Sequence, residues 1–170
     1  MVYKSICAVK GVSAYGIKEG KFGLALIRAS GTAAGVFTQN LARAAPIELM
    51  RKQIKSGKLE AVIANSGCAN AYTGKRGYAD ALEMTEYAGS ALGLEAKSIG
   101  VASTGVIGRY LDLPLIRRQC AEVALKLETS PAAEDATVRA IMTTDTKPKH
   151  ALVRREGFTI GAIAKGSGMI

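Results

Sequence analysis

The segment Glu60-Ala-Val-Ile-Ala-Asn-Ser-Gly-Cys-Ala-Asn-Ala71 begins with mostly apolar residues and ends in small polar ones. Its first five residues are a compact apolar run of strand length, and the small polar residues after Ala64 mark where that run stops. A second run of this kind, Ile99-Gly-Val-Ala-Ser103, is followed directly by Thr104-Gly105. The two runs predict two buried strands, each ending in residues that carry hydroxyls, amides or glycine.

Helical patterns lie between and after these strands. They cover residues 47–55 after Pro46, residues 78–92, residues 113–127 after the capping residue Asp112, and a segment that starts at Ser130-Pro131. Serine and aspartate are residue types that cap helices, and proline is tolerated in a first helical turn. Strands and helices therefore alternate, which predicts a mixed α/β fold. No repeat or linker divides the chain, so residues 1–170 are expected to form a single domain.

Two hairpins are also expected. The apolar runs Leu24–Ala29 and Ala33–Phe37 are joined by Ser30-Gly31-Thr32, where glycine would supply the unusual backbone angle of a turn. Near the end of the chain, residues 151–153 and 158–163 can pair around Glu156-Gly157. Both pairs predict short antiparallel ribbons.

The chain carries a net charge of +9 over 170 residues, with basic clusters around residues 51–58 and 147–155. Nucleic-acid binding is one reading of this charge. However, no aromatic residues interleave with the basic runs, and no helix-turn-helix, zinc or RNA-recognition signature is present. Affinity for carboxylate substrates, or for an acidic partner chain, explains the charge more simply.

Cysteine use and hydropathy predict a cytoplasmic protein. Cys7, Cys68 and Cys120 are odd in number, far apart and outside any Cys-x-x-Cys pair, which argues against disulfides and zinc. The first ten residues lack the apolar core of a secretory signal, and no apolar run is long enough to cross a membrane.

Few residues suit histidine or metal chemistry. The one histidine, His150, lies in Lys147-Pro-Lys-His and is expected to be a loop residue at the surface. No HExxH motif or acidic cluster at ligand spacing is present, so no metal or cofactor is expected. The run from Gly161 to Gly166 lacks the Gly-Lys-Ser/Thr ending of a phosphate loop, which favours a glycine bend after a strand.

Three segments gather hydroxyls, small residues and backbone amides: Asn65–Ala71, Ser103–Gly105 and Met142–Thr146. A strand that ends in Ser-Thr-Gly can present successive N–H groups and a hydroxyl to an oxyanion. Taken one at a time, these residues are also the ordinary residues of turns and helix caps. Their order along the chain is more informative than any one of them.

Five motifs occur in order: Ala34-Gly-Val-Phe-Thr-Gln-Asn40, Val62-Ile-Ala-Asn-Ser-Gly67 with its continuation to Gly74, Ala102-Ser-Thr-Gly-Val-Ile-Gly108, Ala140-Ile-Met-Thr-Thr-Asp-Thr146 and Ala164-Lys-Gly-Ser-Gly-Met-Ile170. From about Gly11 to its last residue, the chain resembles the α chain of the ornithine acetyltransferase family, also called bifunctional glutamate N-acetyltransferase. The resemblance implies a sandwich of sheets flanked by helices that a β chain completes.

In that family a precursor cuts itself before a threonine, and the new amino-terminal threonine of the β chain is the nucleophile. The resemblance thus implies a ping-pong transfer of acetyl from N2-acetylornithine to glutamate in arginine biosynthesis, by an α2β2 assembly. Use of acetyl-CoA as a second donor stays open. The threonine's own α-amino group can serve as the base, which fits the shortage of histidine.

Carried over by motif, Thr104 and Gly105 are expected to form the oxyanion hole, and Thr143 and Lys165 to contact the substrate. Two departures stand out: Cys68 replaces the more usual asparagine, and the Ala-Pro-Asn-Met-Ala-Thr continuation expected after Ile170 is not in the sequence. The nucleophile is therefore expected on a partner chain. A self-cleaving aminopeptidase or amidase of the same fold, and a basic nucleic-acid-binding module, are the alternatives.

Overall fold

The computed structural model describes residues 2–168, and it confirms the mixed α/β class. Its principal elements, in chain order, are β1 (Ser13–Glu19), β2 (Phe22–Thr32), α1 (Ala45–Gln53), β3 (Lys58–Cys68), α2 (Gly74–Leu92), β4 (Ile99–Val106), α3 (Leu113–Leu125), α4 (Pro131–Ile141), β5 (Lys149–Arg155) and β6 (Phe158–Ala164). Three single 3-10 turns accompany them: η1 (Ile6–Ala8), η2 (Ile54–Ser56) and η3 (Ala96–Ser98).

The main sheet has four strands in the order β1-β2-β3-β4. Its first two pairings are antiparallel, whereas β3 and β4 are parallel and are connected through α2. The two strands expected at residues 60–64 and 99–103 are confirmed as the interiors of β3 and β4. Both strands continue beyond their apolar runs, so the Asn-Ser-Gly-Cys and Ser-Thr-Gly segments are themselves paired.

The hairpin expected at Ser30-Gly31-Thr32 is wrong. Strand β2 runs on through this segment, with Gly31 opposite Leu59 and Thr32 opposite Lys58, after an irregularity in register that begins at Arg28. The hairpin turn lies earlier, where Gly20 adopts a φ of +57° between β1 and β2. A distant strand, β3, supplies the hydrogen bonds that keep β2 extended, and a local pattern cannot reveal this.

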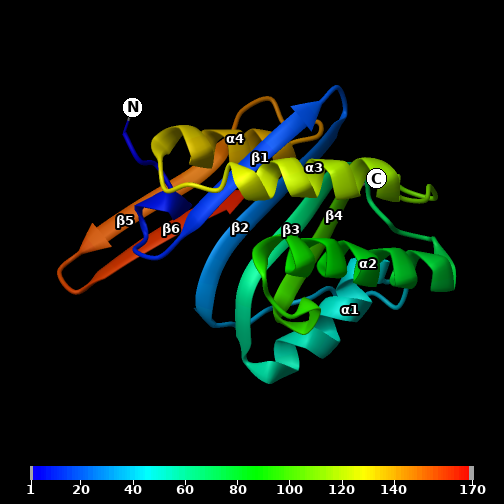
Figure 1. The fold of residues 1–170 in the computed structure, drawn as a ribbon. Helices are drawn as coiled ribbons and strands as arrows, with labels where there is room; N and C mark the ends of the chain where they lie inside the picture. Colours follow the sequence, from blue (N-terminus) through cyan, green and yellow to red (C-terminus); the bar gives the residue numbers. More distant parts are fainter. Residues whose placement is uncertain (1, 169–170) are drawn as a thin grey trace.

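Helices α1, α2 and α3 cover one face of the sheet (Figure 1). Apolar side chains of these helices pack against apolar side chains of the sheet and form the main core. Removing this apolar surface from water stabilises the fold. Its fully buried members include Leu24, Leu26, Ile63, Met84, Ile99 and Val123. Small and aliphatic side chains therefore make up most of this core.

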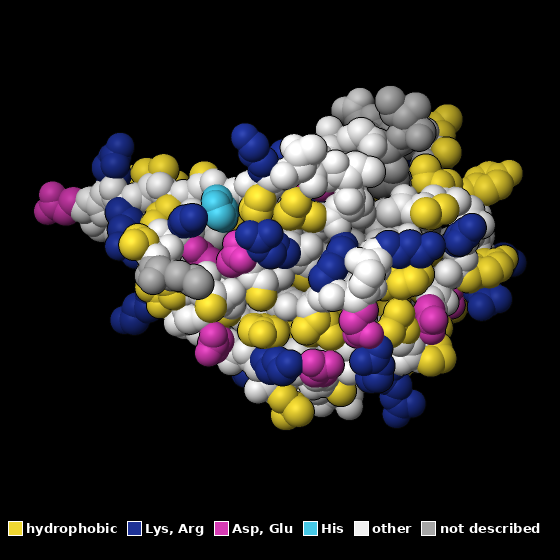
Figure 2. Space-filling model, turned by 90° about the horizontal axis from the view of Figure 1, so that it is seen from above, with side chains coloured by type: hydrophobic (Ala, Val, Ile, Leu, Met, Phe, Trp, Pro, Cys, Tyr) yellow, Lys and Arg dark blue, Asp and Glu magenta, His cyan; other side chains and the backbone are white. Residues whose placement is uncertain are grey.

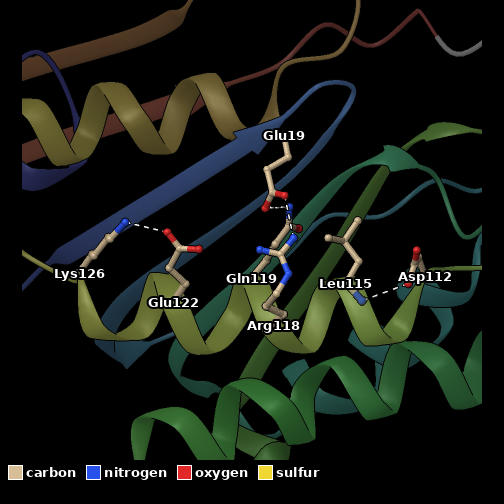
Figure 3. A network of polar contacts seen from close by, with 7 residues as sticks. All are labelled: Glu19, Asp112, Leu115, Arg118, Gln119, Glu122 and Lys126. Atoms are coloured by element: carbon tan, nitrogen blue, oxygen red, sulfur yellow. Dashed lines mark hydrogen bonds and ion pairs between the residues drawn. The ribbon is translucent and has the colours of Figure 1, made fainter.

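Side-chain hydrogen bonds attach α3 to the edge of the sheet (Figure 3). The Glu19 carboxylate at the end of β1 accepts from Arg118 at 2.7 Å and from the buried Gln119 at 3.0 Å. Asp112 caps the helix as expected by accepting from the amide of Leu115 at 3.0 Å. The two Glu19 contacts connect α3 to β1, whereas the cap stabilises the start of the helix itself.

The opposite face of the sheet carries α4, whose expected cap is confirmed by a 3.0 Å hydrogen bond from the Ala133 amide to Ser130 Oγ. The helix lies close because Gly16 and Gly23 face it from β1 and β2. A Cβ at Gly23 would lie 2.7 Å from Ser66 Oγ and closer still to the Ala140 carbonyl. The glycine therefore permits the close contact between the end of α4 and the sheet.

We expect Gly23→Ala to destabilise the chain by about 1–3 kcal/mol, because the added methyl overpacks a contact with backbone that cannot rotate away. Urea unfolding followed by circular dichroism measures the change. Gly31→Ala is the matched control, since Gly31 lies in the same strand with nothing within 4 Å of its Cβ position. Equal midpoints for the two variants would contradict the packing argument.

The second expected hairpin is confirmed as β5–β6, in which Ala151 pairs with Ala162 and Val153 with Ile160. It packs against η1 near the amino terminus, where a Cβ at Gly161 would lie 2.5 Å from the carbonyl of Ser5. Gly161 thus serves close packing inside β6, the strand in which the sequence placed it, and the strand ends at Ala164. The expectation for His150 is wrong: it is not a surface loop residue, because it lies in β5 and is partly buried.

Cys7, Cys68 and Cys120 are buried free thiols. Among residues 2–168, no helix is both long and apolar enough to cross a membrane. Figure 2 shows Lys and Arg side chains spread over one face and interspersed with acidic and hydrophobic ones, not gathered into a single basic stripe.

Candidate active site

The candidate site lies where β3 and β4 end side by side. In the parallel register Ser66 is opposite Thr104, and Gly67 is opposite Gly105. The two strand ends that the sequence analysis singled out separately are therefore neighbours. Beyond Gly67 the register becomes irregular, and Cys68 pairs with both Thr104 and Val106.

Two glycines make this junction possible. Gly105 has a φ of +131°, and a Cβ on it would lie 2.6 Å from the amide nitrogen of Cys68. Gly67 has a φ of +103°, and its Cβ would lie 2.7 Å from the carbonyl oxygen of Lys21. Residues with side chains rarely adopt such angles, so both positions need glycine for conformation as well as for space.

A cavity of about 520 Å³ opens at this junction, and all four predicted site residues line it. Thr104 and Gly105 come from the end of β4, Thr143 from the segment after α4, and Lys165 from the segment after β6. Residues far apart in the sequence thus share one wall. His150 is not among the lining residues.

The cavity is cationic. Lys18, Lys21 and Lys165 line it, and none of its lining residues within 2–168 is acidic. Burial lowers the pKa of the Lys18 ammonium, while the carboxylate of Asp145 acts in the opposite direction. A cavity of this charge favours ligands that carry carboxylates.

Asp145 connects the segment that carries Thr143 with the segment that carries Lys165, a role that the sequence motifs did not assign. Its buried carboxylate accepts from the amide of Gly166 at 2.6 Å and of Thr143 at 3.4 Å, and pairs with Lys149. The carboxylate therefore holds Thr143 near Lys165. The only sequence signal was its place in Thr143-Thr-Asp-Thr146, where an aspartate that binds nearby amides is common.

These contacts lower the pKa of Asp145 from 3.8 to about 2, chiefly through the Lys149 hydrogen bond. A carboxyl with a lowered folded-state pKa stabilises the fold above pH 3.8, and this contribution disappears as the pH falls towards 2. We expect Asp145→Asn to flatten the decline in unfolding free energy between about pH 4 and pH 2. Urea titrations at several pH values test this, with the exposed Asp135→Asn as control. An unchanged acid profile would contradict the assignment.

Comparison with known proteins bears on this site. A protein-family model described as the ArgJ family matches residues 9–170. The chain belongs to the ArgJ family. Among curated ArgJ relatives, it is 55% identical over 167 residues to a glutamate N-acetyltransferase of Methanosarcina mazei, covering 97% of this chain and 42% of that protein. It is 50% identical to the arginine biosynthesis bifunctional protein ArgJ of Archaeoglobus fulgidus, with 97% and 43% covered.

Solved ArgJ structures share the fold over nearly the whole chain. The ornithine acetyltransferase of Mycobacterium tuberculosis, solved in complex with ornithine, superposes with a TM-score of 0.93 at 35% identity, covering 98% of this chain and 94% of that one. The bifunctional ArgJ protein of Bacillus halodurans gives a TM-score of 0.89 at 38% identity. The chain spans about two fifths of the length of the curated relatives it matches. The family resemblance stated from the motifs is thereby confirmed.

Proposed function

We propose that this chain is the α chain of a glutamate N-acetyltransferase, which moves an acetyl group from N2-acetylornithine to glutamate. The observation that carries the proposal is the convergence of Thr104, Gly105, Thr143 and Lys165 on one cationic cavity. The names of two relatives, glutamate N-acetyltransferase and the arginine biosynthesis bifunctional protein ArgJ, support this choice of reaction.

In the proposed first half-reaction, the hydroxyl of an amino-terminal threonine on a partner chain attacks the acetyl carbonyl of N2-acetylornithine. The carbonyl oxygen becomes an oxyanion, which the Thr104 hydroxyl and the Gly105 backbone amide stabilise. Collapse of the intermediate breaks the amide bond, leaves acetyl on the threonine and releases ornithine after its amine takes up a proton. The threonine's α-amino group carries that proton from hydroxyl to leaving amine.

In the second half-reaction, the amine of glutamate attacks the acetyl-threonine ester at the same oxyanion hole. N-acetylglutamate leaves and the threonine hydroxyl recovers its proton. Thr143 and Lys165 are proposed to bind the substrate: an ammonium suits the α-carboxylate that both amino acids carry. One site can thus serve donor and acceptor in turn.

The proposed partner is a β chain from the same precursor, in an α2β2 assembly. Two coverages support a second chain: this sequence covers 94% of the solved Mycobacterium chain but only 42% of the Methanosarcina mazei relative. The solved chain is therefore much shorter than the curated polypeptides. The net charge of +9 favours an acidic partner surface.

The decisive experiment combines this chain with its co-purifying partner. Amino-terminal sequencing should show a partner that begins with threonine, and N2-acetylornithine plus glutamate should give N-acetylglutamate and ornithine. Release of free acetate without N-acetylglutamate would instead identify the hydrolase of the same fold. A parallel reaction with acetyl-CoA distinguishes a bifunctional enzyme from one that only recycles acetyl groups.

A further inference from the structure

Lys18 lies in β1, outside every motif of the sequence analysis, yet it reaches into the candidate site. Its ammonium donates to Ser66 Oγ at 2.6 Å, to the carbonyl of Met142 and, at 3.5 Å, to the carbonyl of Ala140. A lysine ammonium has three N–H donors, and all three are directed at protein acceptors. Little capacity remains for it to bind a substrate carboxylate directly.

The three acceptors lie in two parts of the site: one at the end of β3 and two at the end of α4. Ser66 is opposite Thr104 in the sheet, whereas Ala140 and Met142 end α4 and lead directly to Thr143. Ser66 Oγ also donates to the Ala140 carbonyl at 2.6 Å. Lys18 and Ser66 together therefore connect the ends of β3 and β4, where Thr104 and Gly105 lie, to the segment that carries Thr143.

Physical chemistry favours a cation at this place. The last carbonyls of a helix have no partner within the helix, and they carry the negative end of its dipole. Gly23 keeps the space open, because a Cβ there would lie 2.7 Å from Ser66 Oγ and 2.9 Å from Lys18 Cδ. The ammonium charge is compensated by its three acceptors and by the field of the Asp145 carboxylate.

We propose that Lys18 is a positioning residue, which holds residues 142–146 against the end of β3 so that Thr143 stays aligned with Thr104 and Gly105. Asp145 restrains the same segment from the β6 side. The inference rests on the proposed function and deepens it, since it names what aligns the two halves of that site.

The test uses the complex of this chain with its partner. Lys18→Met keeps the apolar stem and removes every donor, and it is expected to lower kcat for acetyl transfer about 10- to 100-fold, because small displacements of a binding group cost rate of this order. Amide hydrogen exchange of residues 142–146 should become faster, while exchange in β2 and β3 is unchanged. Lys58→Met, at the far end of β3, is the matched control with normal kcat.

A double-mutant cycle sharpens the result. Ser66→Ala removes the hydroxyl that accepts from Lys18 and donates to the Ala140 carbonyl, so its effect on kcat should be clearly less than additive with Lys18→Met. Lys18→Arg, which keeps charge and donors, should recover part of the lost rate. If Lys18→Met proves too unstable to purify, the arginine and Ser66 variants carry the same two measurements.

Normal kcat and normal exchange in the folded Lys18 variants would overturn the proposal. A raised KM with unchanged kcat and exchange would also overturn it, because Lys18 would then contact substrate directly. Absence of acetyl transfer in the unmodified complex would refute the proposed function instead. The exchange measurement still decides whether Lys18 orders residues 142–146.

Discussion

Replacing Thr104 by alanine is expected to lower kcat for acetyl transfer by about 10²–10³, because loss of one oxyanion donor typically costs this much. Thr104 is largely buried at the end of β4, next to Ser66 and at the wall of the 520 Å³ cavity. In the proposed oxyanion hole this hydroxyl stabilises charge that develops in the transition state, so we expect kcat to fall while KM changes little. Steady-state kinetics of the complex with N2-acetylornithine and glutamate measure both constants.

Thr104→Ser is the control, since it keeps the hydroxyl and removes one methyl. It should retain activity within about tenfold, far above the alanine variant. Circular dichroism and association with the partner should be unchanged in both. A Thr104→Ala complex with normal kcat would exclude Thr104 from the oxyanion hole and leave only the Gly105 amide of the proposed pair.

Glu134→Ala is expected to give the largest loss of stability, about 3–5 kcal/mol. The Glu134 side chain is buried in α4 at 1% exposure and accepts hydrogen bonds from the amides of Lys4, Ser5 (3.1 Å) and Cys7 (3.2 Å). Truncation leaves three amides near η1 without their charged acceptor. Denaturant unfolding with a circular dichroism readout measures the free-energy change.

Asp135→Ala is the matched control for that experiment. Asp135 is the next residue in α4, and its ion pair with Arg139 is largely exposed. Exposed pairs contribute little, so the control should lose no more than about 1 kcal/mol. Similar losses for the two variants would show that Glu134 does not anchor the amino-terminal segment.

Several elements could be predicted because their signals are local. The caps Asp112 and Ser130 and the apolar spacing that follows them identified α3 and α4 correctly. Strand β1 was missed, β2 was ended too early at Ala29, and the strand expected at Ala33–Phe37 lies in no strand of the structure. Strands β1 and β2 mix small, polar and apolar residues, and only their pairing in the sheet keeps them extended.

The candidate site also contains residues that the sequence predicted and residues that it did not. Thr104, Gly105, Thr143 and Lys165 were predicted from ordered motifs, and the fold brings all four to one cavity. Asp145 and Lys18 were not assigned roles. Their importance depends on acceptors and donors far away in sequence, such as Gly166 for Asp145 and Met142 for Lys18.

The mixed α/β class, the order of the helices and the residue types that the chemistry needs could be predicted from the sequence alone, since caps, hydrophobic period and motifs act over a few positions. Three features become visible only in the folded chain. β3 and β4 end in register, Gly67 and Gly105 let the two strands meet, and Lys18 and Asp145 make hydrogen bonds to the segment around Thr143. The reason is physical: hydrogen bonds and close packing depend on distance in space, which chain folding sets and sequence spacing does not.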